Sequence, residues 1–335
     1  MTSRPALSIC IATWNRAHYL SQLLDSLKEQ VNDEVEVVVS DNASTDDTQA
    51  VASAAGKSFA HFVYHRNPEN IGAERNFESA VRRSRGRYCW IVGDDDVVEA
   101  GAVDAVLQAL RSGDDVYLGD RTTTDVNLAV LQVERWLDDP PADGRFVLQS
   151  ARDLAGYFHK ARSIGAVFSY VSVFIFSRER WDRVTLWEEF VGTGYAHAAV
   201  CVSILIQGAT LTYLGRSIVL CRLGNDSFAQ DGYGRRFMLD VEGYHRIGHL
   251  VPETARPAFL HIVKREKDWL RIAKARVLMT GGEWQQLRDR LEAGYGYNRS
   301  GLAVIDKLLY VKSILMALEA VRGRVRWLRI RRDRA

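Results

Sequence analysis

The sequence predicts an α/β protein, with a sheet flanked by helices and a helical C-terminal subdomain. Three observations lead to this prediction. Short apolar runs alternate with amphipathic segments over the first 120 residues, the apolar runs are rich in β-branched residues, and the pattern is mostly helical from Arg235 onward. Repeated strand–helix units favour parallel strands with helices on both faces of the sheet. A chain of 335 residues has room for such a domain and a smaller appended one.

Apolar or β-branched runs mark the expected strands, and apolar residues at helical spacing mark the expected helices. The expected strands are residues 7–12, 35–39, 59–65, 87–92, 115–118, 169–176 and 210–219. The expected helices are residues 19–27, 48–55, 76–84, 100–111 and 198–207. Between residues 120 and 162 the pattern loosens, and Asp138-Asp139-Pro140-Pro141 indicates a loop. We expect one domain over residues 1–234 and a helical region over residues 235–335, in which one helix face carries Trp269, Ile272, Ala273, Arg276 and Val277.

The composition excludes a disordered or fibrous chain, because 47% of the residues are apolar and 26% are charged. No segment offers the roughly 20 apolar residues that cross a bilayer, and the N-terminus lacks the apolar stretch of a signal peptide. The four cysteines are far apart in apolar runs, and no CxxC pair suggests zinc. We therefore expect a cytoplasmic protein whose membrane association, if any, is peripheral.

The acidic run Gly93-Asp94-Asp95-Asp96 follows an apolar strand. Adjacent carboxylates raise one another's pKa unless a cation neutralises them, and Mg²⁺ and Mn²⁺ prefer oxygen ligands. The alternative is a solvated acidic turn that caps the helix beginning near Val98. On its own the run does not decide between a metal site and a cap.

Three further polar loops favour a binding site. They are Thr13-Trp14-Asn15-Arg16, residues 41–48, and Asn70-Ile71-Gly72-Ala73-Glu74-Arg75-Asn76. Loops that follow parallel strands meet beyond the carboxyl edge of the sheet, where ligands of such folds bind. Together with the acidic run, and in the same order over roughly residues 7–120, these motifs resemble those of the family-2 glycosyltransferases of the GT-A fold.

The resemblance implies a Rossmann-like mixed sheet that binds a nucleotide sugar, with a donor half at 1–120 and an acceptor half at 121–234. It implies a metal-dependent enzyme that transfers a sugar to a hydroxyl group. By this resemblance Asp41 would accept from the base or ribose, Thr13 would line the same pocket, and Arg16 and Arg75 would meet phosphate oxygens. The expected donor-binding residues are Thr13, Asn15, Arg16, Asp41, Asn42, Arg75, Asp94, Asp95 and Arg222. Asn42, Ser44 and Asp46 also have a simpler explanation as loop formers.

The expected ligands of the divalent cation, Mn²⁺ or Mg²⁺, are Asp94 and Asp96, whose spacing places both side chains on one face of an extended segment. The family pattern has an acid where Gly93 stands, so the register of the run, and with it the ligand, stays open. The cation is expected to bridge the diphosphate and act as a Lewis acid while it leaves. Asp96 is therefore also an expected catalytic residue.

The acceptor side departs from the family pattern. Many relatives carry a Glu-Asp pair at a helix start, where Gly192-Thr193-Gly194-Tyr195-Ala196-His197 stands here. His197 is the expected general base, with Glu188 and Glu189 as rivals and a cap or packing role as the alternative. With Cys221-Arg222-Leu223-Gly224-Asn225-Asp226-Ser227, this segment resembles the abequosyltransferase-like subgroup of bacterial O-antigen assembly. That resemblance implies transfer of a deoxyhexose or another nucleotide-linked sugar to a lipid-linked saccharide.

The stretch from Arg322 to Arg334 holds seven arginines against Asp333, with Trp327, Leu328 and Ile330 between them. This composition predicts contact with the anionic inner face of a membrane. Nucleic-acid binding is the less favoured account, and solvated disorder is the other alternative. For the whole chain, the alternatives to a glycosyltransferase are a Mg²⁺-dependent nucleotidyltransferase and a non-catalytic nucleotide- or membrane-binding protein.

Overall fold

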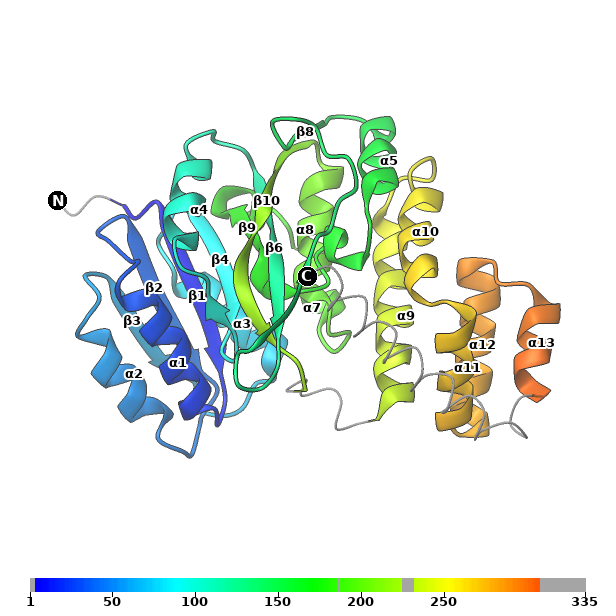
Figure 1. Ribbon diagram of the computed structural model, residues 1–335, viewed down its shortest axis with the longest axis horizontal. Coiled ribbons are helices and arrows are strands. Elements are labelled where there is room, and N and C mark those ends of the chain that lie inside the picture. Colours follow the sequence, from blue (N-terminus) through cyan, green and yellow to red (C-terminus); the bar gives the residue numbers. More distant parts are fainter. Residues whose placement is uncertain (1–3, 186, 225–231, 308–335) are drawn as a thin grey trace, which may run out of the picture. The chain divides into compact units, whose positions relative to one another are not determined.

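The computed structural model describes residues 4–185, 187–224 and 232–307. The chain divides into two compact units, Met1–Gly224 and Asn225–Ala335. The first unit holds the strands β1 to β10, and the described part of the second is helical (Figure 1). Helix α9, the first described helix of the second unit, begins at Tyr233.

The described strands of the first unit form one mixed sheet in the order β3-β2-β1-β4-β9-β6-β10-β5, with β7 paired to β6 and β8 to β10. Strands β1 to β4 are mutually parallel, whereas β9 is antiparallel to both β4 and β6. This confirms the expected mixed sheet flanked by helices. The strands are β1 Leu7–Thr13, β2 Val35–Asp41, β3 Phe62–Arg66, β4 Tyr88–Gly93, β5 Val97–Val98, β6 Val116–Thr124, β7 Val130–Glu134, β8 Arg145–Leu148, β9 Phe174–Ser177 and β10 Ala209–Arg222.

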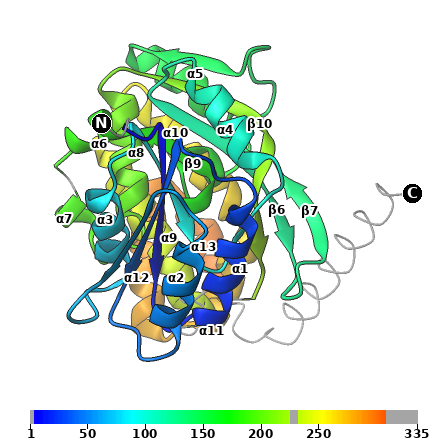
Figure 2. The same cartoon turned by 90° about the vertical axis from the view of Figure 1, so that its left-hand side faces the viewer.

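Helices cover both faces of the sheet. Helices α1 and α2 pack together on one face of the first strands, and α3 packs against β1 and β2 from the opposite face (Figure 2). Helix α8 is buried along nearly all of its length, which explains why it is apolar on every side. The helices of the first unit are α1 Ala17–Lys28, α2 Thr48–Gly56, α3 Ala73–Arg83, α4 Ala102–Leu110, α5 Ala151–Lys160, α6 Arg178–Asp182, α7 Trp187–Phe190 and α8 Ala196–Ile206, with 3-10 turns at Ile164–Val167 and Val171–Val173.

The segment whose pattern loosens, residues 120–162, contains more regular structure than a loop. It holds the end of β6, the strands β7 and β8, and helix α5. Strand β7 is half exposed at the edge beside β6, so it lacks the buried alternation that marks a strand in a sequence. The expected strand at 169–176 is also corrected, because Val171–Val173 forms a 3-10 turn and the strand covers only Phe174–Ser177.

The register of the parallel strands aligns their polar ends. Thr13 of β1 lies opposite Asp41 of β2, Asp41 lies opposite Arg66 of β3, and Ala12 lies opposite Gly93 at the end of β4. Because these strands run in the same direction, the loops after Thr13, Asp41 and Gly93 leave the sheet at one edge. This edge is where the sequence motifs meet.

The second unit consists, in its described part, of α9 Tyr233–Leu250, α10 Arg256–Glu266, α11 Trp269–Leu278, α12 Gly281–Tyr295 and α13 Arg299–Lys307. Asp268 caps α11, and Thr280 with Glu283 forms a capping box on α12. On α11 the side chains of Ile272, Ala273 and Val277 are buried as expected, whereas Trp269 is 41% exposed. No described helix is long and apolar enough to cross a membrane. The arginine-rich stretch 322–334 lies outside the described residues.

Candidate active site

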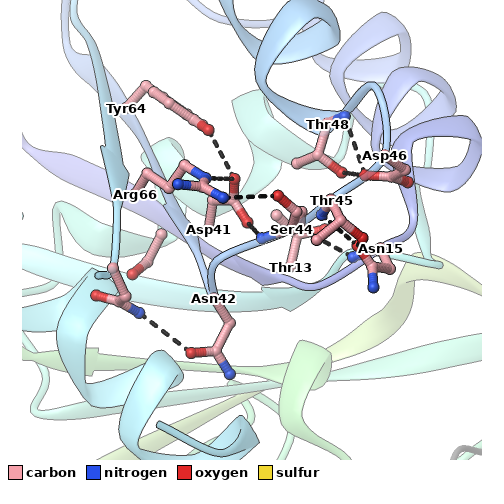
Figure 3. A network of polar contacts seen from close by, with 12 residues as sticks. Thr13, Asn15, Asp41, Asn42, Ser44, Thr45, Asp46, Thr48, Tyr64 and Arg66 are labelled. Atoms are coloured by element: carbon pink, nitrogen blue, oxygen red, sulfur yellow. Dashed lines mark hydrogen bonds and ion pairs between the residues drawn. The ribbon is translucent and has the colours of Figure 1, made fainter. Parts of the chain in front are cut away.

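Asp41 is fully buried at the end of β2, and its two oxygens are held from different sides (Figure 3). Oδ1 accepts a hydrogen bond from the Ser44 backbone N–H at 2.9 Å, and Oδ2 accepts one from the Tyr64 hydroxyl at 2.7 Å. Arg66 Nε lies 3.8 Å from Oδ2. Burial and the neighbouring carboxylate raise the pKa of Tyr64, so its hydroxyl keeps its proton and remains a donor. Asp41 is thus a fixed acceptor at the sheet edge.

The loop after β1 is tied to the loop after β2. The Asn15 N–H donates to Ser44 Oγ at 2.9 Å, and Asn15 Oδ1 accepts from the Thr45 N–H at 2.7 Å (Figure 3). Asn15 has a φ of 52°, a left-handed conformation that asparagine tolerates better than most residues. Asp46 accepts from the Ala17 N–H at the start of α1 at 3.0 Å. These side chains form the loops, and through them they fix the start of α1.

The segment before α3 is anchored at the same edge. Asn42 donates to Asn70 Oδ1 at 2.7 Å and accepts from the Ile71 N–H at 2.9 Å. The buried Asn76 side chain donates to the carbonyl of Ser40 at 2.9 Å and to that of Thr13 at 3.3 Å. Asn42 and Asn76 therefore hold the ends of β1 and β2 and the start of α3 in one network.

The three aspartates after β4 have different surroundings. Arg16 Nη1 lies 3.0 Å from Asp94 Oδ1 and 3.1 Å from Asp95 Oδ2, so one guanidinium bridges two carboxylates. Asp94 is almost buried, with 7% of its side chain exposed, whereas 23% of the Asp95 side chain is exposed. Burial raises the pKa of Asp94 to about 6, although the charge of Arg16 opposes this shift. Arg16 is thus at the acidic run, as the sequence suggested for a phosphate-binding residue.

Asp96 points into the protein. Tyr170 donates to Asp96 Oδ1 and Ser172 donates to Oδ2, each at 2.5 Å. Burial, followed by the charge of Asp95, raises the pKa of Asp96 to about 7. The Arg121 guanidinium lies over the Tyr170 ring, 4.3 Å from its centre, and supplies a positive charge behind the carboxylate. Nothing in the local sequence around Tyr170 and Ser172 marks them as partners of Asp96.

Arg222 ends β10 beside the acidic run. Its Nη1 donates to the Asp95 carbonyl oxygen at 2.5 Å, Nη2 donates to Gln22, and its guanidinium lies 5.1 Å from the centre of the Tyr19 ring. Only 7% of Arg222 is exposed, and its buried Nε has no hydrogen-bond partner within the described residues. Two arginines therefore flank Asp95: Arg16 from the N-cap position of α1 and Arg222 from the end of β10.

Two neighbouring side chains offer further contacts at the end of β1. Thr13 Oγ1 is buried and makes no hydrogen bond of ordinary geometry to a described residue, yet it lies near enough to Asp94 to favour that group's charged form. The next residue, Trp14, is 51% exposed. An exposed indole beside a buried polar edge is a stacking surface for a flat ring. Trp14 belongs to the motif that follows β1, but the sequence does not show that its side chain is exposed.

His197 is buried in the first turn of α8. Its Nε2 lies 3.1 Å from the carbonyl oxygen of Phe168, so this nitrogen carries the proton, and its ring stacks on Phe174 with centres 5.8 Å apart. Burial lowers the pKa of His197 to about 4. The ring is therefore neutral at pH 7, but a weak base. Because Phe168 has a φ of 64°, the bond to its carbonyl also supports a strained backbone position.

The first turn of α3 contacts the segment before α8. Arg75 Nη2 pairs with Glu188 Oε2 at 2.8 Å, with 48% and 64% of the two side chains exposed. Glu74 accepts from the N–H groups of Gly192 and Ala196, at 2.5 Å and 3.1 Å. Arg75, expected at the donor phosphates, thus pairs here with one of the rival bases.

The oxygens of the acidic run suit a hard divalent cation. One oxygen of Asp94 and one of Asp95 converge on the same nitrogen of Arg16, so they already face a single positive charge. Among the residues that the structure describes, no cluster of three or more His, Cys, Asp or Glu side chains forms a complete metal site. Mg²⁺ is commonly bound by one or two carboxylates together with substrate phosphates, so two converging carboxylates fit such a cation.

Comparison with known proteins gives a consistent result. Residues 8–183 match the sequence profile of "Glycosyl transferase family 2". The chain is similar to abequosyltransferase RfbV of Salmonella typhimurium, with 32% identity over 321 residues that cover 92% of this chain and 96% of the relative. A β-1,3-glucosyltransferase of Campylobacter jejuni that acts on GalNAc(5)-diNAcBac-PP-undecaprenol is 28% identical over 32% of this chain and 36% of its own.

Two solved structures share the fold. S. aureus TarS in complex with UDP has a TM-score of 0.63 at 14% identity, covering 98% of this chain and 91% of that chain. Mannosyltransferase PcManGT from Pyrobaculum calidifontis, in complex with GDP-Man and Mn²⁺, has a TM-score of 0.54 at 16% identity, covering 95% and 87%. At such low identity the likeness concerns the fold, and it agrees with the expected GT-A architecture.

Proposed function

The chain belongs to glycosyl transferase family 2 and is a glycosyltransferase; on this premise we propose that it moves a sugar from a nucleotide-sugar donor to a hydroxyl group of a lipid-linked saccharide. The observation that carries the proposal is the convergence of Thr13, Asp41 and the acidic run at one edge of the sheet. Family membership sets aside the nucleotidyltransferase and the non-catalytic alternatives.

For the donor nucleoside we propose Asp41, Thr13 and Trp14 as the binding side chains. A buried carboxylate with fixed orientation recognises the N–H groups of a base or the hydroxyl groups of a ribose. The exposed Trp14 offers its ring face to the base, because stacking accepts any base. In this proposal Asn15 and Asn42 act on the donor by shaping the loops that carry these residues.

For the donor diphosphate we propose Arg16, with Arg222 as the support of Asp95. Arg16 can turn from the carboxylates to a phosphate oxygen, because 24% of its side chain is exposed. Arg222 is held by the Asp95 carbonyl and Gln22, and so it fixes the acidic run. Arg75 can reach a phosphate only by breaking its ion pair with Glu188, and this exposed pair is weak.

We propose that Asp94 and Asp95 hold a divalent cation, Mn²⁺ or Mg²⁺, because their oxygens converge, and that Asp96 supports the turn. The pair expected from spacing, Asp94 and Asp96, remains the alternative. The two assignments predict different effects on metal affinity. Asp95→Asn weakens cation binding if Asp94 and Asp95 are the ligands, and Asp96→Asn weakens it if Asp94 and Asp96 are. When bound, the cation supplies Lewis-acid stabilisation to the leaving diphosphate.

We propose a lipid-linked acceptor, in surface-polysaccharide synthesis, because the name of one relative includes an undecaprenol-linked saccharide. A second relative, which this chain matches over 96% of its length, is an abequosyltransferase, and that name specifies the transferred sugar. A deoxyhexose is accordingly the first sugar to test. Peripheral membrane contact through residues 322–334 would bring the enzyme to such an acceptor.

A thermal-shift screen tests the donor half of the proposal. The purified protein is heated with UDP-, GDP-, dTDP- and CDP-sugars, each with Mn²⁺ or with a chelator. We expect one nucleotide to raise the melting temperature, more so with Mn²⁺, and to lose this effect in Asp41→Asn. A protein that responds to none of the four nucleotides would contradict the proposal.

A further inference from the structure

Glu74 connects two parts of the protein: the sheet edge where the loops after Thr13, Asp41 and Gly93 leave the strands, here called the donor edge, and the start of helix α8. It lies in the first turn of α3, two residues before Asn76, whose side chain is bonded to the carbonyls of Ser40 and Thr13 at the ends of β2 and β1. Its carboxylate accepts from the backbone of the 192–196 segment, which follows in the chain more than a hundred residues later. No motif in the sequence pairs these two segments.

The backbone of residues 192–196 is shaped to hold an anion. Gly192 and Gly194 have φ values of 88° and 74°, and such left-handed positions allow nearby N–H groups to point toward one centre. The N–H of Gly192 lies 2.5 Å from Glu74 Oε2 and that of Ala196 lies 3.1 Å from Oε1, and the amide of Gly194 also favours the charged carboxylate. The segment wraps around Glu74.

Glu74 also provides the cap that α8 lacks. Tyr195 stands at the N-cap position and makes no side-chain hydrogen bond to the helix, so the free N–H of Ala196 finds its acceptor in another helix. A carboxylate at a helix N-terminus interacts favourably with the helix dipole. Burial raises the pKa of Glu74, while its backbone hydrogen bonds oppose that shift.

We propose that Glu74 is a positioning residue of the transfer reaction, which sets the start of α8 against the donor edge. The inference rests on the proposed function, because it takes the start of α8, which the sequence places on the expected acceptor side, as the segment that meets the acceptor. Residues 192–197 of this chain include no carboxylate, and Glu74 supplies one to this helix start from α3. Loss of Glu74 therefore weakens acceptor binding and leaves donor binding intact.

Amide hydrogen exchange tests the contact without any substrate. In Glu74→Gln, one carboxylate oxygen becomes an NH₂ group that cannot accept, so we expect the amides of residues 192–196 to exchange about tenfold faster. Glu78→Gln is the matched control, one turn further along α3, where the carboxylate accepts from Arg82 and not from the 192–196 segment. Unchanged exchange in Glu74→Gln would overturn the inference, whatever the fate of the proposed function.

Kinetics test the consequence, with a polyprenyl-diphosphate-linked saccharide as acceptor and the four nucleotide sugars as donors. We expect Glu74→Gln to raise the acceptor KM about tenfold, with the donor KM unchanged and the pH profile of kcat retained. Gly192→Ala strains the same turn, because residue 192 has a φ of 88°, although the added methyl group meets no atom within 4 Å. We expect Gly192→Ala to raise the acceptor KM, and Gly192→Asn to raise it much less, since asparagine tolerates such a φ better. If Glu74→Gln instead lowered kcat, left both KM values unchanged and removed the acidic limb of the pH profile, Glu74 would be the base and the positioning role would be overturned.

The two arms separate the failures. If the wild-type protein transfers no sugar to this acceptor, the proposed function fails while the exchange experiment still decides the Glu74 contact. If wild-type transfer is normal and Glu74→Gln equals Glu78→Gln in acceptor KM, the inference alone is wrong. Thermal melting of each variant confirms that the protein is folded before it is assayed.

Discussion

Arg16 places a positive charge against two carboxylates of the acidic run, and its replacement gives a quantitative prediction. In Arg16→Met the side chain keeps its apolar length and loses the guanidinium that lies 3.0 Å from Asp94 and 3.1 Å from Asp95. Breaking a buried ion pair by removing one partner costs about 3–5 kcal/mol, and the exposure of Arg16 and Asp95 reduces this to about 2 kcal/mol. We expect that loss at pH 8, where Asp94 is ionised.

The expected change in melting temperature follows from the size of the unit. A loss of about 2 kcal/mol lowers the melting temperature of a domain of 150–250 residues by about 4–8 °C. Mn²⁺ should restore most of the loss in Arg16→Met, because it replaces the missing charge between the same carboxylates. Calorimetric titration should then show tighter Mn²⁺ binding than in wild type, and weaker binding of the nucleotide diphosphate.

Arg85→Met is the matched control. Arg85 Nε pairs with the fully buried Glu36 at 2.8 Å. Arg85 precedes β4 and Glu36 lies near the start of β2, so this pair is at the amino end of the parallel strands. We expect Arg85→Met to destabilise the protein without changing its response to Mn²⁺. The reasoning is refuted if Mn²⁺ stabilises Arg16→Met no more than Arg85→Met, since the carboxylates would then not share a cation site.

Two further predictions concern the same edge of the sheet. His197→Ala should destabilise the protein by about 2–4 kcal/mol, because it removes a buried ring and a hydrogen bond to Phe168. His197→Gln should retain much of the stability and of the turnover. If both variants fold and lose turnover equally, that result would support His197 as the general base. Burial raises the pKa values of Asp94 and Asp96 to about 6 and 7, so folding favours their protonated forms. Their contribution to the free energy of unfolding is therefore largest below about pH 4 and is lost as the pH rises through 6–7. Because Mn²⁺ binds the deprotonated carboxylates, its stabilising effect should grow from pH 5.5 to pH 8, and a thermal shift by Mn²⁺ that is constant over this range would contradict the assignment.

The sequence predicts the donor edge because each of its motifs depends only on the strand that directly precedes it. Each motif directly follows an apolar run, and parallel strands bring their carboxyl ends together whatever the rest of the fold. The register confirms this for Thr13, Asp41 and Gly93. Asp46 and Ser44 could likewise be predicted as loop formers, since short polar side chains bond to nearby backbone.

The contacts that the sequence did not predict join segments far apart in the chain. Tyr170 and Ser172 reach Asp96 from a 3-10 turn next to β9, a strand inserted antiparallel between β4 and β6. Glu74 reaches the start of α8 only because α3 crosses back over β1 and β2. Such contacts depend on strand order, which local periodicity does not encode.

His197 shows the same limit in another form. Its place at a helix start suggested an acid–base role, but α8 is buried on every side, so the ring is enclosed and packs on Phe174. The apolar composition of the helix was visible in the sequence, and it already favoured burial of a lone polar residue within it. The role of His197 as general base therefore stays a prediction, with a packing role favoured by the geometry.

The most direct test of the account is transfer of a labelled sugar from its nucleotide to a lipid-linked saccharide, measured with Mn²⁺, with a chelator, and in Asp95→Asn. We expect the wild-type protein to transfer the sugar with Mn²⁺. The chelator should lower the transfer rate about 100-fold or more, and added Mn²⁺ should restore the rate. Asp95→Asn should be similarly slow at any Mn²⁺ concentration that saturates the wild type. Transfer that persists unchanged in both the chelator and the variant would contradict a metal-assisted reaction at the acidic run.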